Sequence, residues 1–424
     1  MPYNATLYVA AANAYVEVSR YFRPPIRLRR MSLLAQPPRR SALVLMRYHN
    51  VCLEAFGYTL PDEIVTSSEI EAMLAPLYRR LRLPEGRLEL MTGIRQRRFW
   101  KPGTLPSEPS TASAEKAIRA AAIDKAEIGA LIHASVCRDY LEPATACGVH
   151  HRLGLGPHCQ IFDVSNACLG VLNGMVQVAN MIELGQIRAG LVVGTESSRQ
   201  LVETTIARLN DDETLTREQM KLAVASLTIG SASAAVLLTD RELSRTGNRL
   251  LAGVARTNSE FHALCHSGRD ESVAGDMRPL MQTDSERLLR AGVETAREAF
   301  ASFLDEIDWG PAELDKTFCH QVGVAHRKLL LEALGLAPSI DFSTVEFLGN
   351  TGSAAVPITA ALGIEEGHLS KGDRVGLLGI GSGINVVMLG VEWQRSLQWP
   401  LRRPMAFEGT AFEGTTGRFE TKRN

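Results

Sequence analysis

Short apolar runs alternate with longer stretches of helical spacing through most of this chain. Three runs read as strands: Gln160–Val164, which we expect to be buried, and the short apolar runs Ala189–Gly194 and Val375–Gly379. Apolar residues recur at helical spacing from Cys168 through Ile182, and again along Ala354–Leu362. An alternation of strands and helices predicts an α/β fold in which the helices pack against sheets.

The two halves of the chain repeat one pattern. A helix precedes the strand that contains Gly194, and another precedes the strand that ends at Gly379. Aligning these two glycines places Cys168 on Ser353, so the turns that enter the two helices are pseudo-equivalent. The polar stretch 240–250 is where we expect the two halves to meet.

Cys168 is the first candidate for chemistry, because it lies where a strand gives way to a helix. The polar turn Ser165–Ala167 precedes it. A thiol at the start of a helix lies near unpaired N–H groups and the positive end of the helix dipole, and both favour the thiolate. The alternative is a cysteine that only packs in the core, as most free cysteines do.

A histidine and an asparagine farther along the chain occupy similar positions. His320 stands just before the helical stretch Val324–Leu334, and Asn350 lies in the glycine-flanked loop Leu348–Ser353. With a cysteine they can act as nucleophile, proton acceptor and oxyanion donor. Taken singly, His320 could be a core histidine with satisfied hydrogen bonds, and Asn350 could serve a left-handed turn.

The motifs around these residues resemble those of the thiolase-superfamily condensing enzymes, in the β-ketoacyl-acyl-carrier-protein synthase III branch. The matching motifs fall within residues 47–395 and are Thr92–Arg98, Asn166–Cys168, His320–Val322, Gly349–Ser353 and Gly379–Gly383. The resemblance implies the thiolase fold, in which two pseudo-duplicated halves form a five-layered α/β/α/β/α arrangement. It also places Cys168, His320 and Asn350 on the catalytic triad of that family, with no cofactor.

One segment, Arg138–Ala146, distinguishes among the branches of this family. It carries Glu142 where chain-initiating synthases usually have an apolar residue, and is similar to the branch that joins two long-chain acyl-CoA molecules head to head. A malonyl donor forms its carbanion by losing carbon dioxide, whereas a simple acyl thioester must lose an α-proton to a base. By the resemblance, Glu142 is that base and reaches the partner subunit's site in a homodimer. The alternative is a surface or N-cap carboxylate beside Pro143. The charged stretch Arg208–Ala225 is similar to the same branch.

The glycine-rich segment Gly379–Gly383 could be mistaken for a dinucleotide-binding fingerprint. That motif requires a helix after it, and Ile384–Trp393 reads as a strand instead. By the resemblance, backbone amides in this segment and the N–H of Cys168 hold the thioester oxyanion, and the segment could equally serve as a tight hairpin. The amides concerned are those of Gly381, Ser382 and Gly383.

Three arginines lie within the first of these motifs, Thr92–Arg98. Guanidinium groups suit the phosphates of coenzyme A, and the family uses this neighbourhood at the mouth of its tunnel. We take Arg95 as the candidate for binding coenzyme A, because a solvated run of charge is an equal explanation for at least two of the three. The other two are Arg97 and Arg98.

Composition narrows the function classes. A net charge of −1 over 424 residues gives no electrostatic reason to expect nucleic acid as a partner. No run of eighteen apolar residues occurs, so no membrane span is predicted. The seven cysteines lack paired Cys-x-x-Cys spacing, which argues against a disulfide framework or a metal site. They favour a reducing compartment, and we expect a cytoplasmic protein.

The two ends differ from the middle. Residues 1–45 hold seven arginines and one acidic residue, and we expect a disordered or spurious extension, with Met46 as the true start and a targeting segment as the minority alternative. We expect 46–245 to be the half that carries Cys168, 246–395 the half that carries His320 and Asn350, and 396–424 a disordered tail.

The sequence therefore predicts an acyltransferase. Its reaction would be a non-decarboxylative Claisen condensation of two long-chain acyl-CoA molecules to a 2-alkyl-3-oxoacyl product, through an acyl-Cys168 intermediate. The nearest alternative is a β-ketoacyl-acyl-carrier-protein synthase III that uses malonyl-acyl-carrier protein. Two further alternatives are a polyketide or 3-hydroxy-3-methylglutaryl synthase and a non-catalytic acyl-binding partner in a multienzyme complex.

Overall fold

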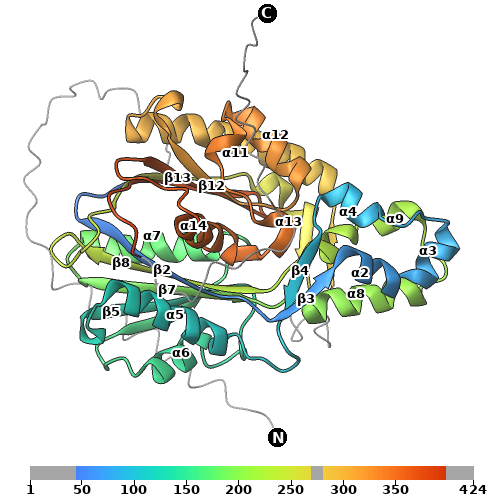
Figure 1. Cartoon of the computed structure of the whole chain (residues 1–424), viewed down its shortest axis with the longest axis horizontal. Coiled ribbons are helices and arrows are strands. Elements are labelled where there is room, and N and C mark those ends of the chain that lie inside the picture. The colour runs from blue at the N-terminus through green and yellow to red at the C-terminus, as the bar shows by residue number, and fades with distance from the viewer. Residues whose placement is uncertain (1–43, 269–279, 398–424) are drawn as a thin grey trace, which may run out of the picture. The chain divides into compact units, whose positions relative to one another are not determined.

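Ten strands form the centre of the described chain, which comprises residues 44–268 and 280–397 of a computed structural model (Figure 1). They follow the order β12-β13-β14-β9-β2-β8-β7-β5-β6, with β1 paired to β9. Strands β2 and β9 share a single residue pair, Cys52 with Arg249, so the path divides into two sheets of five strands. The predictions about residues 1–43 and 398–424 lie outside the described residues.

Each sheet draws its strands from more than one region of the sequence. The first sheet contains β2 (Val51–Thr59), β5 (Ile128–Ala134), β6 (Gln160–Val164), β7 (Ala189–Glu196) and β8 (Ala232–Asp240). The second contains β1 (Val44–Arg47), β9 (Arg249–Thr257), β12 (Lys316–Cys319), β13 (Arg374–Gly381) and β14 (Asn385–Glu392). The chain crosses between the sheets in the turn from β8 to β9, and β1 begins two residues ahead of the predicted start of the domain.

Helices cover both sheets and fill the space between them. Helices α5 (Ser107–Ala121) and α6 (Thr145–Leu153) cover the outer face of the first sheet, and α11 (Ser285–Ile307) and α12 (Val324–Leu334) lie on the outer side of the second. Between the sheets lie α7 (Gly170–Glu183) and α14 (Ala355–Glu365). The result is the five-layered α/β/α/β/α order that the resemblance implied (Figure 1).

The two middle helices have the sequences that their positions require. Every residue of α14 from Ala355 to Ile364 is buried, because the helix packs against β2 and β8 on one side and β12 and β13 on the other. A helix that is apolar all round is stable only when it is enclosed in this way. On α7, Leu172 lies so close to β13 that a Cβ at Gly379 would come within 2.4 Å of it, so glycine is required there.

Most predicted elements are present, with shifted ends. The strands predicted at 189–194 and 375–379 extend to Glu196 and Gly381, and the strand predicted after Gly383 is β14, which excludes a dinucleotide fingerprint. Helix α7 starts at Gly170 instead of at Cys168. The expectation that β6 is a buried strand is wrong, because β6 is the edge of its sheet and most of its residues are partly exposed.

A second group of elements lies beside the layers, to the right in Figure 1, and encloses a hydrophobic cluster of its own. It contains β3 (Glu63–Thr66), α2 (Ser67–Met73), α3 (Ala75–Leu81), α4 (Arg87–Thr92), β4 (Gln96–Phe99), α8 (Arg199–Asp211), α9 (Arg217–Lys221) and η3 (Val224–Thr228). The remaining elements used below are η4 (Ser259–Leu264), β10 (Cys265–Ser267), β11 (Met281–Thr283), α13 (Val345–Leu348) and η7 (Gly352–Ala354).

Candidate active site

Cys168 lies in the loop between β6 and α7, two residues before the helix begins. Ala167 adopts a left-handed conformation with φ 44°, which turns the chain into the helix. Burial raises the pKa of the Cys168 thiol to about 12, and the nearby Glu196 carboxylate and Cys265 raise it further. Desolvation thus opposes the helix start, which favours the thiolate, in the protein without substrate.

The predicted oxyanion segment lies against the loop that carries Cys168. A Cβ at Gly381 would be 3.6 Å from the backbone nitrogen of Cys168. Asn385 Nδ2 donates hydrogen bonds to Asn166 Oδ1 at 3.3 Å and to the carbonyl of Ser382 at 3.2 Å, so one side chain joins the two loops. The structure thus brings together the two sets of amides that the sequence assigned to the oxyanion.

His320 follows β12 and is buried, with 3% of its surface exposed. Its backbone N–H donates to the carbonyl of Leu378 in β13, three residues before Gly381, at 2.9 Å. Burial lowers the pKa of His320 to about 3, and the neighbouring His326 lowers it further. Its Nδ1 has no hydrogen-bond partner within the described chain. His320 is therefore a neutral imidazole that can accept a proton.

Asn350 is held in place by its backbone. Its N–H donates to the carbonyl of Thr228 at 3.0 Å, and its carbonyl accepts from the N–H of Gly230 at 2.9 Å. The side-chain Oδ1 accepts from the N–H of Gly352 at 3.0 Å. Since Oδ1 is occupied in this way, the Nδ2 group remains as the donor that Asn350 can offer to a ligand.

Gln321, next to His320, supports the asparagine loop and was quoted from the sequence only as part of a motif. Its Nε2 donates to the carbonyl of Phe342 at 2.6 Å, and its Oε1 accepts from the N–H groups of Thr344 at 2.9 Å and Val345 at 3.1 Å. The residue beside the histidine thereby fixes the start of α13, which leads to Asn350. The hydrogen bonds between Gln321 and the turn before α13 could not be predicted from sequence spacing.

Glu142 is exposed on the loop between β5 and α6, and it makes no hydrogen bond or ion pair within residues 44–268 and 280–397. The N-cap alternative is wrong, because α6 is preceded by Ala144 and its first amides are bound by another carboxylate. Asp163 accepts from the N–H of Thr145 at 2.7 Å and of Ala146 at 2.9 Å. The other alternative, a surface carboxylate, agrees with the exposure of Glu142, which makes no structural contact within the described residues.

The three arginines have different environments. Arg97 is fully buried and donates to Ser67 Oγ at 3.2 Å, and burial lowers its pKa to about 10. Arg98 is partly buried and donates to the carbonyl of Pro61 at 2.8 Å. A solvated run of charge is therefore wrong for these two, and only Arg95 is exposed.

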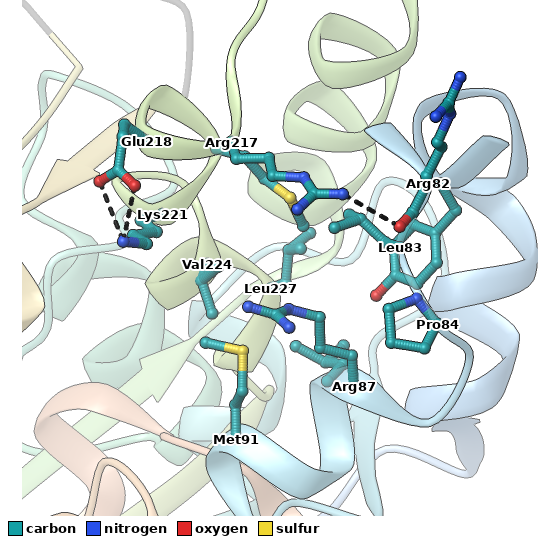
Figure 2. Close-up of a pocket in the computed structure, with 13 residues that line it drawn as sticks. Arg82, Leu83, Pro84, Arg87, Met91, Arg217, Glu218, Lys221, Val224 and Leu227 are labelled. Atoms are coloured by element: carbon teal, nitrogen blue, oxygen red, sulfur yellow. Dashed lines mark hydrogen bonds and ion pairs between the residues drawn. The ribbon is translucent and has the colours of Figure 1, made fainter. Parts of the chain in front are cut away.

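A pocket of about 270 Å³ lies between α3 and α4 on one side and α9 and η3 on the other (Figure 2). Apolar side chains line it beside four cationic residues, which are Arg82, Arg87, Arg217 and Lys221. Arg217 donates to the carbonyls of Leu81 and Arg82, and Lys221 pairs with Glu218 at 2.9 Å. The guanidinium of Arg87 has no hydrogen bond or ion pair with any described residue, so it is available to an anion.

This pocket adjoins the site through η3. Leu227 lines the pocket, and the next residue, Thr228, binds the backbone of Asn350. Arg95 is not among the lining residues, although it lies shortly after α4. The sequence pointed to the charged stretch Arg208–Ala225 but did not predict that it would meet α4 to form a pocket.

All seven cysteines are free thiols. Within residues 44–268 and 280–397, no group of three or more His, Cys, Asp or Glu side chains could hold a metal ion. Among the described helices, none is long and apolar enough to cross a membrane.

Comparison with known proteins agrees with this geometry. The family model for the thiolase N-terminal domain matches residues 103–254, and that for the 3-oxoacyl-[acyl-carrier-protein] synthase III C-terminal domain matches residues 304–393. The acyl-CoA:acyl-CoA alkyltransferase of Shewanella oneidensis is 43% identical over 82% of this chain and 100% of its own length. The acyl-CoA:acyl-CoA alkyltransferase of Xanthomonas campestris is 36% identical over 82% and 100%.

Solved structures agree as well. A crystal structure of a Xanthomonas campestris OleA variant with bound lauric acid and lauroyl-CoA has a TM-score of 0.76 at 36% identity, covering 82% of this chain and 100% of that one. The fold and the site together define an acyltransferase of the thiolase superfamily, as the motifs predicted. Within that superfamily, the chain belongs to the acyl-CoA:acyl-CoA alkyltransferase family.

Proposed function

We propose that this protein condenses two long-chain acyl-CoA molecules to a 2-alkyl-3-oxoacyl product by a non-decarboxylative Claisen reaction. The observation that carries the proposal is the 43% identity to an acyl-CoA:acyl-CoA alkyltransferase over 82% of this chain. Glu142, an exposed carboxylate without a partner in the described residues, is free to serve as the base. The seven free cysteines fit a reducing compartment such as the cytoplasm.

The first half-reaction loads the enzyme. Cys168 Sγ attacks the thioester carbonyl of one acyl-CoA while neutral His320 accepts the thiol proton. The N–H of Cys168 and the amides of Gly381–Gly383 stabilise the oxyanion. The carbon–sulfur bond to coenzyme A breaks, the proton on His320 passes to the departing thiolate, and acyl-Cys168 remains.

The second half-reaction forms the new carbon–carbon bond. The Glu142 carboxylate takes an α-proton from a second acyl-CoA, and the resulting enolate oxygen is held by Asn350 Nδ2 and His320. The α-carbon attacks the carbonyl of acyl-Cys168, whose sulfur leaves as a thiolate. The proton that Glu142 holds returns this thiolate to a thiol, so the enzyme is regenerated.

A homodimer would bring Glu142 to this site from the partner subunit. The loop that carries Glu142 exposes three large apolar side chains, which are Val136, Tyr140 and Leu141. The neighbouring strand β6 is an edge of its sheet, with one side unpaired in the described chain. Exposed apolar groups beside an open strand edge are typical of a surface that another chain covers.

The coenzyme A end of the substrate fits the pocket beside α4. Its phosphates need cations, and the guanidiniums of Arg82 and Arg87 both lack a protein partner in the described chain. Figure 2 shows the Arg82 side chain directed away from the pocket, so Arg87 is the candidate. Arg95, near the other end of α4, stays a second candidate for the same group. The apolar wall formed by Met91, Val224 and Leu227 suits the less polar parts of the ligand (Figure 2).

Replacing Arg87 by alanine is expected to raise the KM for acyl-CoA by about tenfold, because a charge-assisted hydrogen bond to phosphate contributes roughly 1.5 kcal/mol. The kcat should change little, since Arg87 does not contact the reacting atoms. The measurement is the initial rate of coenzyme A release as the concentration of acyl-CoA varies. Lys221→Ala is the matched control, because its charge is already paired with Glu218. An unchanged KM in Arg87→Ala would place the phosphates elsewhere.

The proposed reaction is tested with purified protein and a saturated long-chain acyl-CoA in the absence of any malonyl donor. Release of coenzyme A is followed, and the lipid product is identified by mass spectrometry. A doubled-chain β-keto acid, or the ketone formed when it decarboxylates, supports the proposal. Acylated Cys168 that yields product only after malonyl-acyl-carrier protein is added would contradict it and identify a chain-initiating synthase. No acylation would favour a non-catalytic acyl-binding role.

A further inference from the structure

Glu196 is a buried carboxylate beside the site to which the proposed mechanism gives no part. It is the last residue of β7, a strand that is otherwise apolar or small, and it is 5% exposed. A carboxylate is costly to bury unless donors satisfy it. The hydrogen-bond donors around Glu196 therefore show what stabilises this carboxylate in the interior.

Three donors bind the same oxygen of Glu196. Oε1 of Glu196 accepts hydrogen bonds from Ser353 Oγ at 2.5 Å, from the N–H of Ser353 at 3.2 Å and from the N–H of Val136 at 3.3 Å. These contacts join the end of β7 to two loops, one that leads from Asn350 into α14 and one that leads to Glu142. Burial raises the pKa of Glu196, and the hydrogen bonds from Ser353 and Val136 act against that rise.

The contact between Glu196 and Ser353 affects Asn350, because both Ser353 and Asn350 belong to the short turn 350–353. Asn350 Oδ1 accepts from Gly352, which is adjacent to Ser353 and has φ +57°. A Cβ at Gly352 would come within 3.0 Å of Glu196 Cγ, so the carboxylate arm fills the space beneath this turn. Movement of Glu196 would therefore move the turn that orients the Asn350 amide.

Glu196 also lies close enough to Cys168 to affect its charge. The groups that raise the pKa of the Cys168 thiol, besides burial, are Glu196 on β7 and Cys265 on β10. Glu196 itself is faced by Ser353, the N–H of Val136 and the Cys137 thiol. A negative charge on Glu196 opposes a second negative charge on Cys168 and so favours the thiol.

We propose that Glu196 is a positioning residue that acts on both halves of the site. It fixes the turn that orients Asn350 through its contacts with Ser353 and Gly352, and its carboxylate adds to the effect of burial at Cys168. The inference about Asn350 rests on the proposed function, because it assigns Asn350 to the condensation step. The inference about Cys168 concerns the protein without substrate.

Two substitutions distinguish the effect of the Glu196 charge from the effect of its hydrogen bond with Ser353. Glu196→Gln removes the charge and retains an oxygen in the place of Oε1, where all three donors bind. Ser353→Ala removes the hydroxyl, which contacts Glu196 and the carbonyl of Ala134, and retains the charge. Circular dichroism and thermal unfolding verify that both variants fold.

The charge is tested by alkylation of Cys168 with iodoacetamide from pH 6 to 10, with the modified peptide quantified by mass spectrometry. Loss of a nearby negative charge lowers the thiol pKa, so Glu196→Gln should react about tenfold faster than wild type at each pH. Ser353→Ala should follow the wild-type profile. A wild-type profile in Glu196→Gln would overturn the inference.

The contact is tested by the rate of condensation after the enzyme has been acylated. Ser353→Ala should condense about tenfold more slowly at an unchanged rate of acylation, because a small misplacement of an oxyanion donor is costly. A wild-type rate of condensation in this variant would also overturn the inference. Since alkylation needs no acyl-CoA, a wild-type enzyme that failed to condense acyl-CoA would contradict the proposed function and leave the alkylation result intact.

Discussion

Replacement of Cys168 by alanine will abolish both acyl transfer and product formation, with a loss of roughly 10⁴-fold or more in rate. No other described group can take over, because the covalent intermediate needs a nucleophile beside the Gly381–Gly383 amides. Intact-protein mass spectrometry after exposure to acyl-CoA, together with release of coenzyme A, provides the measurement. Cys159→Ala is the control, since Cys159 directly precedes β6, at the end of the strand opposite to Cys168, and should be dispensable.

The protonation states of Cys168 and His320 give the acylation step a characteristic pH dependence. With a Cys168 pKa of about 12 and a His320 pKa of about 3, neither group titrates between pH 6 and 9. Acylation of the wild-type enzyme should therefore be nearly flat across that range. It should fall only at low pH, where His320 becomes protonated and can no longer accept the thiol proton. Acylation of Cys168→Ala on another cysteine, at a rate near wild type, would contradict the assignment of the nucleophile.

Replacement of Glu142 by glutamine will leave acylation intact and slow condensation by about 10³-fold, the range expected for loss of a general base. The amide retains the size of the side chain but cannot take the α-proton. The enzyme should release about one coenzyme A per subunit in a burst and then stop, with acyl-Cys168 accumulating. Product formation at a rate near wild type would show that another group is the base.

Mixing the two variants tests whether Glu142 acts in the partner subunit. In a dimer of one Cys168→Ala subunit and one Glu142→Gln subunit, a base supplied across the interface completes one site. Random exchange of equal amounts should then restore about a quarter of the wild-type rate, because half of the dimers are mixed and each has one working site. If each Glu142 serves its own Cys168, neither subunit is complete and no activity returns.

The sequence predicted the elements that carry local signals. Strand β6 and helix α12 have the predicted limits. The middle helices were placed within a few residues, because their apolar periodicity reports burial directly. Cys168, His320 and Asn350 were identified because each lies in a short motif at a turn. Their protonation states were not predictable in the same way, since desolvation by distant segments decides the pKa of Cys168.

The features that the sequence missed depend on long-range contacts. Glu196 binds Ser353 across 157 positions of sequence, and nothing in the chemistry around either residue indicates the other. Arg97 appeared to be one of three surface charges, but it is enclosed by the turns around Gly230 and Gly349. The pocket arises because α4 and α9, which are far apart in sequence, meet in space.

The pocket beside α4 is built on a hydrophobic cluster distinct from those that hold the layers together. Met220 in its wall belongs to this satellite cluster and to no cluster that contains residues of α7 or α14. Apolar substitutions at such positions can therefore change the surface that faces the coenzyme A end of a substrate while the middle layer keeps its packing. Natural sequences should accordingly vary more at these apolar wall positions than at Arg87 or in the middle layer.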